Sequence, residues 1–256
     1  MVPQHDTITP MARTAVDIET PDGTCRATLH TPDGDGPWPG VLYYSDAGGV
    51  RETFAAMADR LAEQGFAVLL PDIYYRTPYA PFDTSTLFGD PGEFARLAAL
   101  ARALTPEKSD DDAGSYLATL AGRPEVVHPA LGTVGYCFGG GMGLRAAGNH
   151  PGSVAATATF HGGNLAAADD PASPHLVAGR IRAAVYVAAA DDDPAFDADQ
   201  HRRLRDAFDA AGVRAEIETY PAAHGFAVPD NPTHDPAADR RHQETMTTFL
   251  RTHLEP

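Results

Sequence analysis

The stretch LGTVGYCFGGG, residues 131–141, decides how the rest of this 256-residue chain is interpreted. An apolar run over 131–136 predicts a short strand, which leads into the turn Gly-x-Cys-x-Gly and then into a helix. In this strand–turn–helix pattern the central residue, here Cys137, is a nucleophile exposed at a sharp turn. Gly135 and Gly139 leave the space that side chains would block.

The position of Cys137 favours reactivity. It would stand at a helix N-terminus, where the dipole and the free N–H groups favour a thiolate over a thiol. The N–H of Phe138 would be free to face an oxyanion. The alternatives are a buried structural cysteine and a phosphate-binding loop. No Gly-Lys-Ser/Thr sequence follows, which excludes a P-loop, and a dinucleotide-binding turn usually lies in the first βαβ unit.

A nucleophilic cysteine needs a base, and the base needs an acid that orients it. His224 follows a predicted strand over 215–219, which puts it in a loop at the carboxyl end of a strand. The acid is expected after the predicted strand over 183–189, where three consecutive aspartates stand at 191–193. The residues alone leave open which of these carboxylates is directed at the histidine.

Strand and helix patterns alternate through most of the chain. Continuous apolar runs at 41–44 and 66–70 are typical of strands buried on both faces. The alternation predicts an α/β fold, with a mostly parallel sheet and helices on both faces, whose active groups gather at the carboxyl ends of the strands. We expect a loose N-terminal arm over 1–13, a single domain over 14–256 and an irregular insert at about 73–92.

Composition and charge narrow the function classes. The net charge is −16, from 19 basic and 35 acidic residues. An acidic surface repels phosphates and anionic lipids, so neither nucleic acid nor a membrane surface is an expected partner. Two cysteines, Cys25 and Cys137, are too few for a disulfide scaffold, and no signal-peptide pattern opens the chain. We therefore expect a cytoplasmic protein with reduced thiols.

The histidines give no metal signature. No His-Glu-x-x-His sequence and no His/Cys pair at zinc spacing occurs, so neither a metal nor a cofactor is expected. His161 directly follows a predicted strand over 154–160 and could border the pocket, although an ordinary loop histidine is the simpler interpretation.

With these motifs in place, the chain resembles the dienelactone hydrolase family of the α/β-hydrolase fold. The resemblance rests on GYCFGG at 135–140, YPAAHGF at 220–226 and LAEQGFAVLLPD at 61–72, and its order and spacing extend over about 40–250. It implies a Cys–His–Asp triad that includes Cys137 and His224. The family's acid is followed three residues later by an apolar residue, which selects Asp193 with Phe196.

The resemblance also implies further site residues. The family's second oxyanion donor maps to the N–H of Ala47, and the acid before it maps to Asp46, where family members usually carry glutamate. Dienelactone hydrolases hold the substrate carboxylate with arginines, one of which usually stands where this chain has Phe-Ala-Val at 226–228. Its absence favours a less charged ester. Arg76 in the irregular insert is the candidate replacement, and Tyr75, Asp46 and His161 are further candidates for the substrate pocket.

The residues and the resemblance together predict an ester or lactone hydrolase that works through an acyl-enzyme on Cys137. The expected partner is a small-molecule ester or lactone, and the chain is expected to be a monomer or a small homo-oligomer. The alternatives are a thioesterase or acyltransferase on the same fold, and a non-catalytic protein that binds a small ligand.

Overall fold

The computed structural model describes residues 11–87 and 89–254, which form an eight-stranded sheet in the order β1-β2-β4-β3-β5-β6-β7-β8. The strands β3 to β8 run parallel to one another, whereas β1 and β2 extend one edge through the antiparallel pairs β1–β2 and β2–β4. The strands are β1 (Met11–Thr20), β2 (Gly23–Pro32), β3 (Trp38–Tyr44), β4 (Ala67–Pro71), β5 (Val126–Tyr136), β6 (Val154–Phe160), β7 (Ala184–Asp192) and β8 (Ala215–Ala223). The predicted mostly parallel sheet is confirmed.

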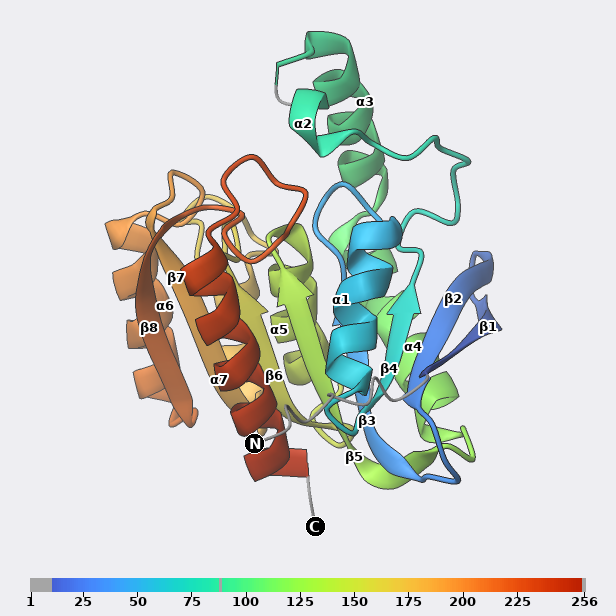
Figure 1. The fold of residues 1–256 in the computed structure, drawn as a ribbon. Coiled ribbons are helices and arrows are strands. Elements are labelled where there is room, and N and C mark those ends of the chain that lie inside the picture. Colours follow the sequence, from blue (N-terminus) through green and yellow to red (C-terminus); the bar gives the residue numbers. More distant parts are fainter. Residues whose placement is uncertain (1–10, 88, 255–256) are drawn as a thin grey trace, which may run out of the picture.

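Helices cover both faces of the sheet (Figure 1). The buried side chains of α1 and α7 join the core on one face, and those of α3, α4, α5 and α6 join the core on the other. In Figure 1, α2 and α3 project above the carboxyl ends of the parallel strands. The helices are α1 (Glu52–Ala62), α2 (Thr84–Leu87), α3 (Pro91–Ala103), α4 (Pro106–Ala121), α5 (Phe138–Asn149), the 3₁₀ helix η1 (Pro174–Arg180), α6 (Ala198–Ala211) and α7 (Pro236–Leu254).

The strand β3 shows why the sequences of the central strands are continuous apolar runs. Val41 and Tyr43 pack into the core on the α1 and α7 face, and Leu42 and Tyr44 pack into the core on the opposite face. Successive side chains of a strand point to opposite faces, so both alternating sets of side chains in a strand covered on both sides are buried and mostly apolar. Among the helices of the described residues, none is long and apolar enough to cross a membrane.

Two segments differ from the sequence expectation. The strand β1 begins at Met11, so three residues of the expected arm belong to the sheet, whereas residues 1–10 of that arm lie outside the described residues. The cause is backbone pairing with β2 along the full length of β1, which its polar sequence does not reveal. The irregular insert at 73–92 contains the short helix α2 and the start of α3.

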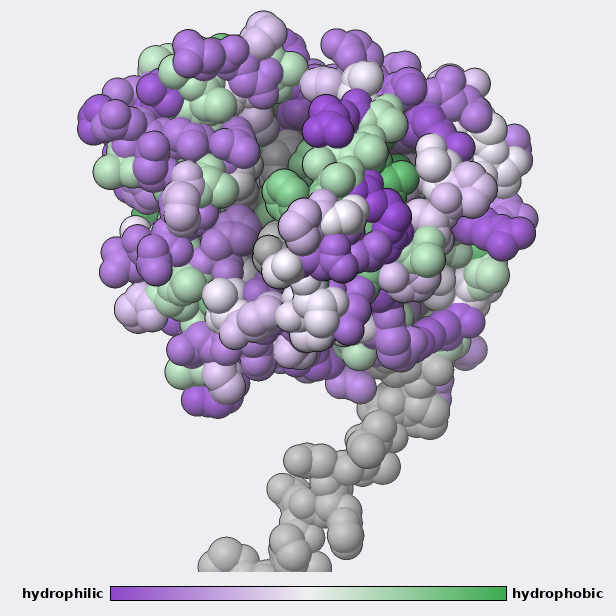
Figure 2. Space-filling view, turned by 90° about the horizontal axis from the view of Figure 1, so that it is seen from above, coloured by the Kyte–Doolittle hydropathy of each residue, from purple (hydrophilic) through white to green (hydrophobic). Residues whose placement is uncertain are grey.

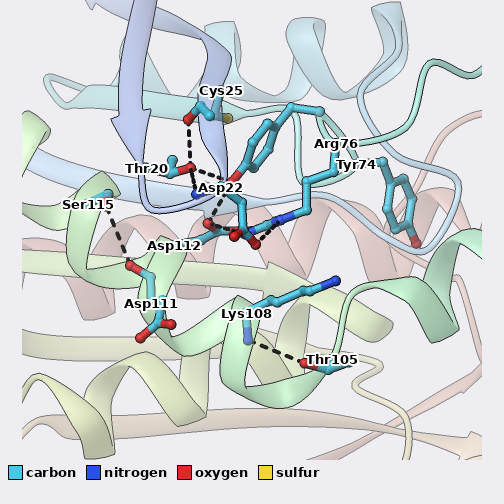
Figure 3. Close-up of polar contacts among 12 residues, drawn as sticks. Thr20, Asp22, Cys25, Tyr74, Arg76, Thr105, Lys108, Asp111, Asp112 and Ser115 are labelled. Atoms are coloured by element: carbon cyan, nitrogen blue, oxygen red, sulfur yellow. Dashed lines mark hydrogen bonds and ion pairs between the residues drawn. The ribbon is translucent and has the colours of Figure 1, made fainter.

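A buried ion pair ties this insert to the rest of the fold. The guanidinium of Arg76 makes two hydrogen bonds to the carboxylate of Asp112 on α4, at 2.7 and 2.8 Å, and a third to Asp22 in the β1–β2 turn (Figure 3). The hydroxyl of Tyr75 donates to the same carboxylate at 3.0 Å. Because the Asp112 side chain is only 1% exposed, Arg76 supplies the charge that makes its burial possible.

Replacing Arg76 should therefore destabilise the fold. Arg76→Met leaves the carboxylate of Asp112 buried without its cation, and we expect the free energy of unfolding to fall by about 2–4 kcal/mol in urea denaturation. Arg123→Met is the matched control, because it removes a partly exposed ion pair with Glu125 and should cost less than about 1 kcal/mol. Equal losses in the two variants would contradict this account of the insert.

Candidate active site

The turn between β5 and α5 holds Cys137 in a strained conformation. Its φ of 51° lies in the left-handed region, which residues other than glycine rarely adopt. The surrounding chain fixes this conformation: the N–H of Cys137 donates to the carbonyl of Phe160 at 3.2 Å, and its carbonyl accepts from Gly140 at 3.1 Å. A Cβ at Gly135 would collide with the backbone of Gly139, so the turn can close only with glycine there. The thiol is partly exposed at the N-terminus of α5.

The register of β7 and β8 brings the histidine and an aspartate together. Asp192 pairs with Ala223 at the ends of these strands, so the residue after each stands at the same edge of the sheet. There the Nδ1 of His224 lies 2.7 Å from the Oδ2 of Asp193, whose side chain is fully buried. Asp191 and Asp192 are exposed, and Asp192 meets the histidine loop only through its carbonyl, which accepts from the N–H of His224 at 3.2 Å.

The electrostatics of His224 depend on its two neighbours. Burial alone lowers the pKa of His224, but hydrogen bonds and charge attraction from Asp193 and Cys137 outweigh burial and raise the pKa to about 10. The raised pKa favours the protonated imidazole at neutral pH. The structure thus places His224 between Asp193, to which its Nδ1 is hydrogen-bonded, and Cys137, with which it lines the same cavity.

The two residues expected to supply oxyanion donors line the same cavity as the thiol. Phe138 is the first residue of α5, so its N–H has no acceptor within the helix. Ala47 lies in the loop after β3 and borders the same cavity as Cys137 and Phe138. Among the described residues, no protein acceptor pairs with either N–H. The positions expected for oxyanion donors are thus next to the thiol and available to a ligand.

An arginine that the sequence analysis did not identify holds the Ala47 loop in place. Arg51 makes two hydrogen bonds to the carboxylate of Asp46, at 2.8 and 2.9 Å, and two more to Asp230, at 2.6 and 2.8 Å. Asp46 also accepts from the N–H of Gly48. The guanidinium therefore joins the loop after β3 to the loop that follows His224. The carboxylate of Asp46 is committed to this clamp, and Asp46 does not line the cavity beside Cys137.

The cavity beside Cys137 has a volume of about 390 Å³ and opens at the carboxyl ends of the parallel strands. Figure 2 looks down on this face, which is mostly hydrophilic with apolar residues gathered near its centre. The wall is formed by the elbow and its helix, the histidine loop, the loops after β3, β6 and β7, and the start of α4. Its lining residues are Ala47, Leu104, Pro106, Ser109, Cys137, Phe138, Gly141, Met142, Arg145, Gly163, Asn164, Asp170, Ala172, Pro174, Ala195 and His224.

Besides Asp46, three other residues expected in the pocket lie elsewhere. Tyr75 and Arg76 do not line the cavity, because both are bound to Asp112 on the far side of the insert (Figure 3). His161 does not line it either. The reason sequence reasoning misplaced Arg76 is that its partner lies 36 positions further along the chain. Arg145, which does line the wall, stands eight residues after Cys137 on α5, and this helical spacing could have identified it.

His161 lies behind the histidine rather than in the cavity. It is fully buried, has a φ of 40°, and its ring centroid is 5.2 Å from that of His224 and 5.1 Å from that of Phe226. Neither ring nitrogen has a hydrogen-bond partner among the described residues. Burial, followed by repulsion from His224, holds the pKa of His161 well below its ordinary value. His161 is therefore a neutral ring that supports the base from behind.

No group of three His, Cys, Asp or Glu side chains suited to hold a metal ion occurs in the part of the chain that the structure describes.

The sheet order, the elbow after β5 and the histidine loop after β8 define the α/β-hydrolase class of fold. Within that class, the family model of the dienelactone hydrolase family matches residues 25–254, so the chain belongs to this family and is a hydrolase.

Similar proteins agree with this assignment. A putative carboxymethylenebutenolidase of Escherichia coli K12 is 27% identical over 211 residues, which cover 80% of this chain and 73% of the relative. The carboxymethylenebutenolidase of Rhodococcus opacus is 27% identical over 228 residues, or 87% of this chain and 85% of that protein. The crystal structure of a putative dienelactone hydrolase from Klebsiella pneumoniae superimposes on this chain with a TM-score of 0.82 at 22% identity. The superposition covers 95% of this chain and 100% of the Klebsiella chain.

The buried ring of His161 should make the fold sensitive to acid. The pKa of His161 is lower in the folded than in the unfolded chain. As the pH falls below about 6.5, the unfolded state therefore takes up a proton that the folded state does not, and the free energy of unfolding decreases. His161→Phe removes this loss. Between pH 7 and pH 5, we expect urea unfolding to show the wild type losing about 2 kcal/mol more than the variant. Parallel pH dependences would show that His161 is not held neutral.

Proposed function

We propose that this protein hydrolyses carboxylic esters or lactones through an acyl-enzyme on Cys137. The observation that carries the proposal is the row formed by Cys137, His224 and the buried Asp193, which ends at a cavity beside two free N–H groups. Nucleophile, base and orienting acid in this arrangement are the constellation of acyl-transfer enzymes. A cavity of about 390 Å³ suits a small-molecule substrate.

In the first half-reaction, the Cys137 thiolate attacks the carbonyl carbon of the ester. The carbonyl oxygen becomes an oxyanion, which the N–H groups of Phe138 and Ala47 stabilise; one such donor is typically worth about 3–4 kcal/mol of barrier. When the intermediate collapses, the bond to the leaving oxygen breaks and His224 gives that oxygen its proton. The acyl group then remains on Cys137 as a thioester, and the alcohol is released or, for a lactone, stays attached to the acyl chain.

In the second half-reaction, neutral His224 accepts a proton from water as the water attacks the thioester carbonyl. Collapse of this intermediate expels the Cys137 thiolate and leaves a carboxylic acid. The buried carboxylate of Asp193 holds the Nδ1–H of the imidazole, so that Nε2 faces the reaction in both halves.

The chemistry of the thiolate supports esters rather than amides. A thiolate leaves more readily than an amide nitrogen, so a tetrahedral intermediate formed from an amide returns to substrate. The names of the relatives from E. coli and R. opacus, carboxymethylenebutenolidases, agree with lactone hydrolysis. A reducing compartment such as the cytoplasm suits an enzyme whose nucleophile must be a free thiol.

Substitution of Cys137, His224 or Asp193 should abolish turnover. We expect Cys137→Ala and His224→Ala to lower kcat/KM for 4-nitrophenyl acetate by at least about 10³-fold, and Asp193→Asn to lower it by a similar order, because the base loses its orientation. Circular dichroism checks that each variant is folded.

Cys25→Ala is the matched control for the nucleophile. Cys25 is fully buried, and burial raises the pKa of its thiol to about 12, so it cannot supply a thiolate. The control should keep the activity of the wild type. Turnover that survives in Cys137→Ala would refute the proposed nucleophile.

A further inference from the structure

The wall of the cavity follows one face of α5 away from the nucleophile. Phe138, Gly141, Met142 and Arg145 line the cavity together with Cys137, at spacings that put them on one side of a helix. With a rise of about 1.5 Å per residue, Arg145 stands about 12 Å along the helix axis from the thiol. A substrate acylated at Cys137 would therefore direct its far end toward this arginine.

The charge of Arg145 is already matched by another residue. Its Nε and Nη2 donate to the two carboxylate oxygens of Asp110 on α4, at 3.1 and 2.5 Å, and its Nη1 donates to the carbonyl of Ala172 at 2.5 Å. A bidentate pair of this kind uses the face of the guanidinium that would otherwise bind a carboxylate. The Arg145 side chain is 15% exposed, so little of it remains open to a ligand.

The other charges at the cavity do not favour an anion. Among the described lining residues, the only further group that can be cationic is His224, which is balanced by Asp193. Asp170 adds a carboxylate to the wall, and the net charge of −16 repels anions as they approach. Apolar side chains form much of the remaining surface: Leu104, Pro106, Met142 and Pro174.

We propose that this cavity selects neutral esters with an apolar acyl chain and discriminates against acyl chains that end in a carboxylate. The proposal rests on the ester hydrolysis proposed above. A carboxylate at the far end of the cavity would have either to displace Asp110 from Arg145 or to remain desolvated without a cation, and both are unfavourable. Arg145 and Asp110 thus determine specificity as a pair, in which Asp110 occupies the place that a substrate carboxylate would take.

The test compares two substrates that differ in one charge. Mono-4-nitrophenyl adipate ends in a carboxylate, and methyl 4-nitrophenyl adipate has the same chain with that carboxylate esterified. Both release 4-nitrophenol, so the chemistry at Cys137 is the same. We expect the wild type to show a kcat/KM at least about tenfold higher for the methyl ester.

A variant then assigns this preference to the pair. Asp110→Asn frees the charge of Arg145, and we expect it to shift the ratio of the two kcat/KM values toward the acid by about tenfold. The ratio is independent of any general loss of activity. Asp111→Asn is the matched control, because Asp111 is the exposed neighbour on the same helix and its substitution removes the same charge without touching Arg145 (Figure 3).

The outcomes separate this inference from the function on which it rests. A wild type that hydrolyses the acid as fast as the methyl ester, with loss of both activities in Cys137→Ala, would overturn the inference and leave the proposed function intact. An equal shift in Asp110→Asn and Asp111→Asn would also overturn it, because the effect would then come from net charge alone. If neither ester is hydrolysed in a Cys137-dependent reaction, both proposals fail.

Discussion

The tight turn at Cys137 is the constraint on which the site depends. The central strand β5 must pass directly into α5, and it can do so only where glycines allow the backbone to approach itself and Cys137 accepts a positive φ. This conformation presents the thiol at the helix N-terminus, next to Phe138, the first residue of α5. The neighbouring strands of the parallel sheet end at the same edge, so His224 lines the cavity of the thiol and Asp193 lies against His224 without any long excursion of the chain.

Paired charges then fix the loops around that turn. Arg51 joins the loops that carry Ala47 and His224, Arg76 ties the insert to α4, and Arg145 is bound to Asp110 at the far end of the cavity. Each guanidinium is largely buried, and each is held by carboxylates that match its geometry. These three arginines of a strongly acidic protein are bound within the structure, which leaves the cavity without a free arginine among its described lining residues.

Local patterns were sufficient to predict the parts of the site that are themselves local. The elbow at 131–141 and the strand-end position of His224 are visible in the sequence because glycines and apolar runs mark them. The choice of Asp193 within 191–193 rested on family resemblance, and its approach to His224 depends on the register of β7 and β8, which no local pattern encodes. Arg76 was misplaced because its partner Asp112 lies 36 positions away. Arg51 was missed because its role is to join two loops, and although Asp46 is only five positions away, Asp230 is 179 positions away.

The most direct test of the central claim is to trap the acyl-enzyme. The wild type is mixed with 4-nitrophenyl acetate, the reaction is stopped in acid within the first turnovers, and the protein is digested and analysed by mass spectrometry. The account predicts an acetyl group on the peptide that contains Cys137, a burst of 4-nitrophenol of about one equivalent per enzyme where deacylation is slower than acylation, and neither signal in Cys137→Ala. An acetyl group on another residue, with unchanged turnover in Cys137→Ala, would contradict it.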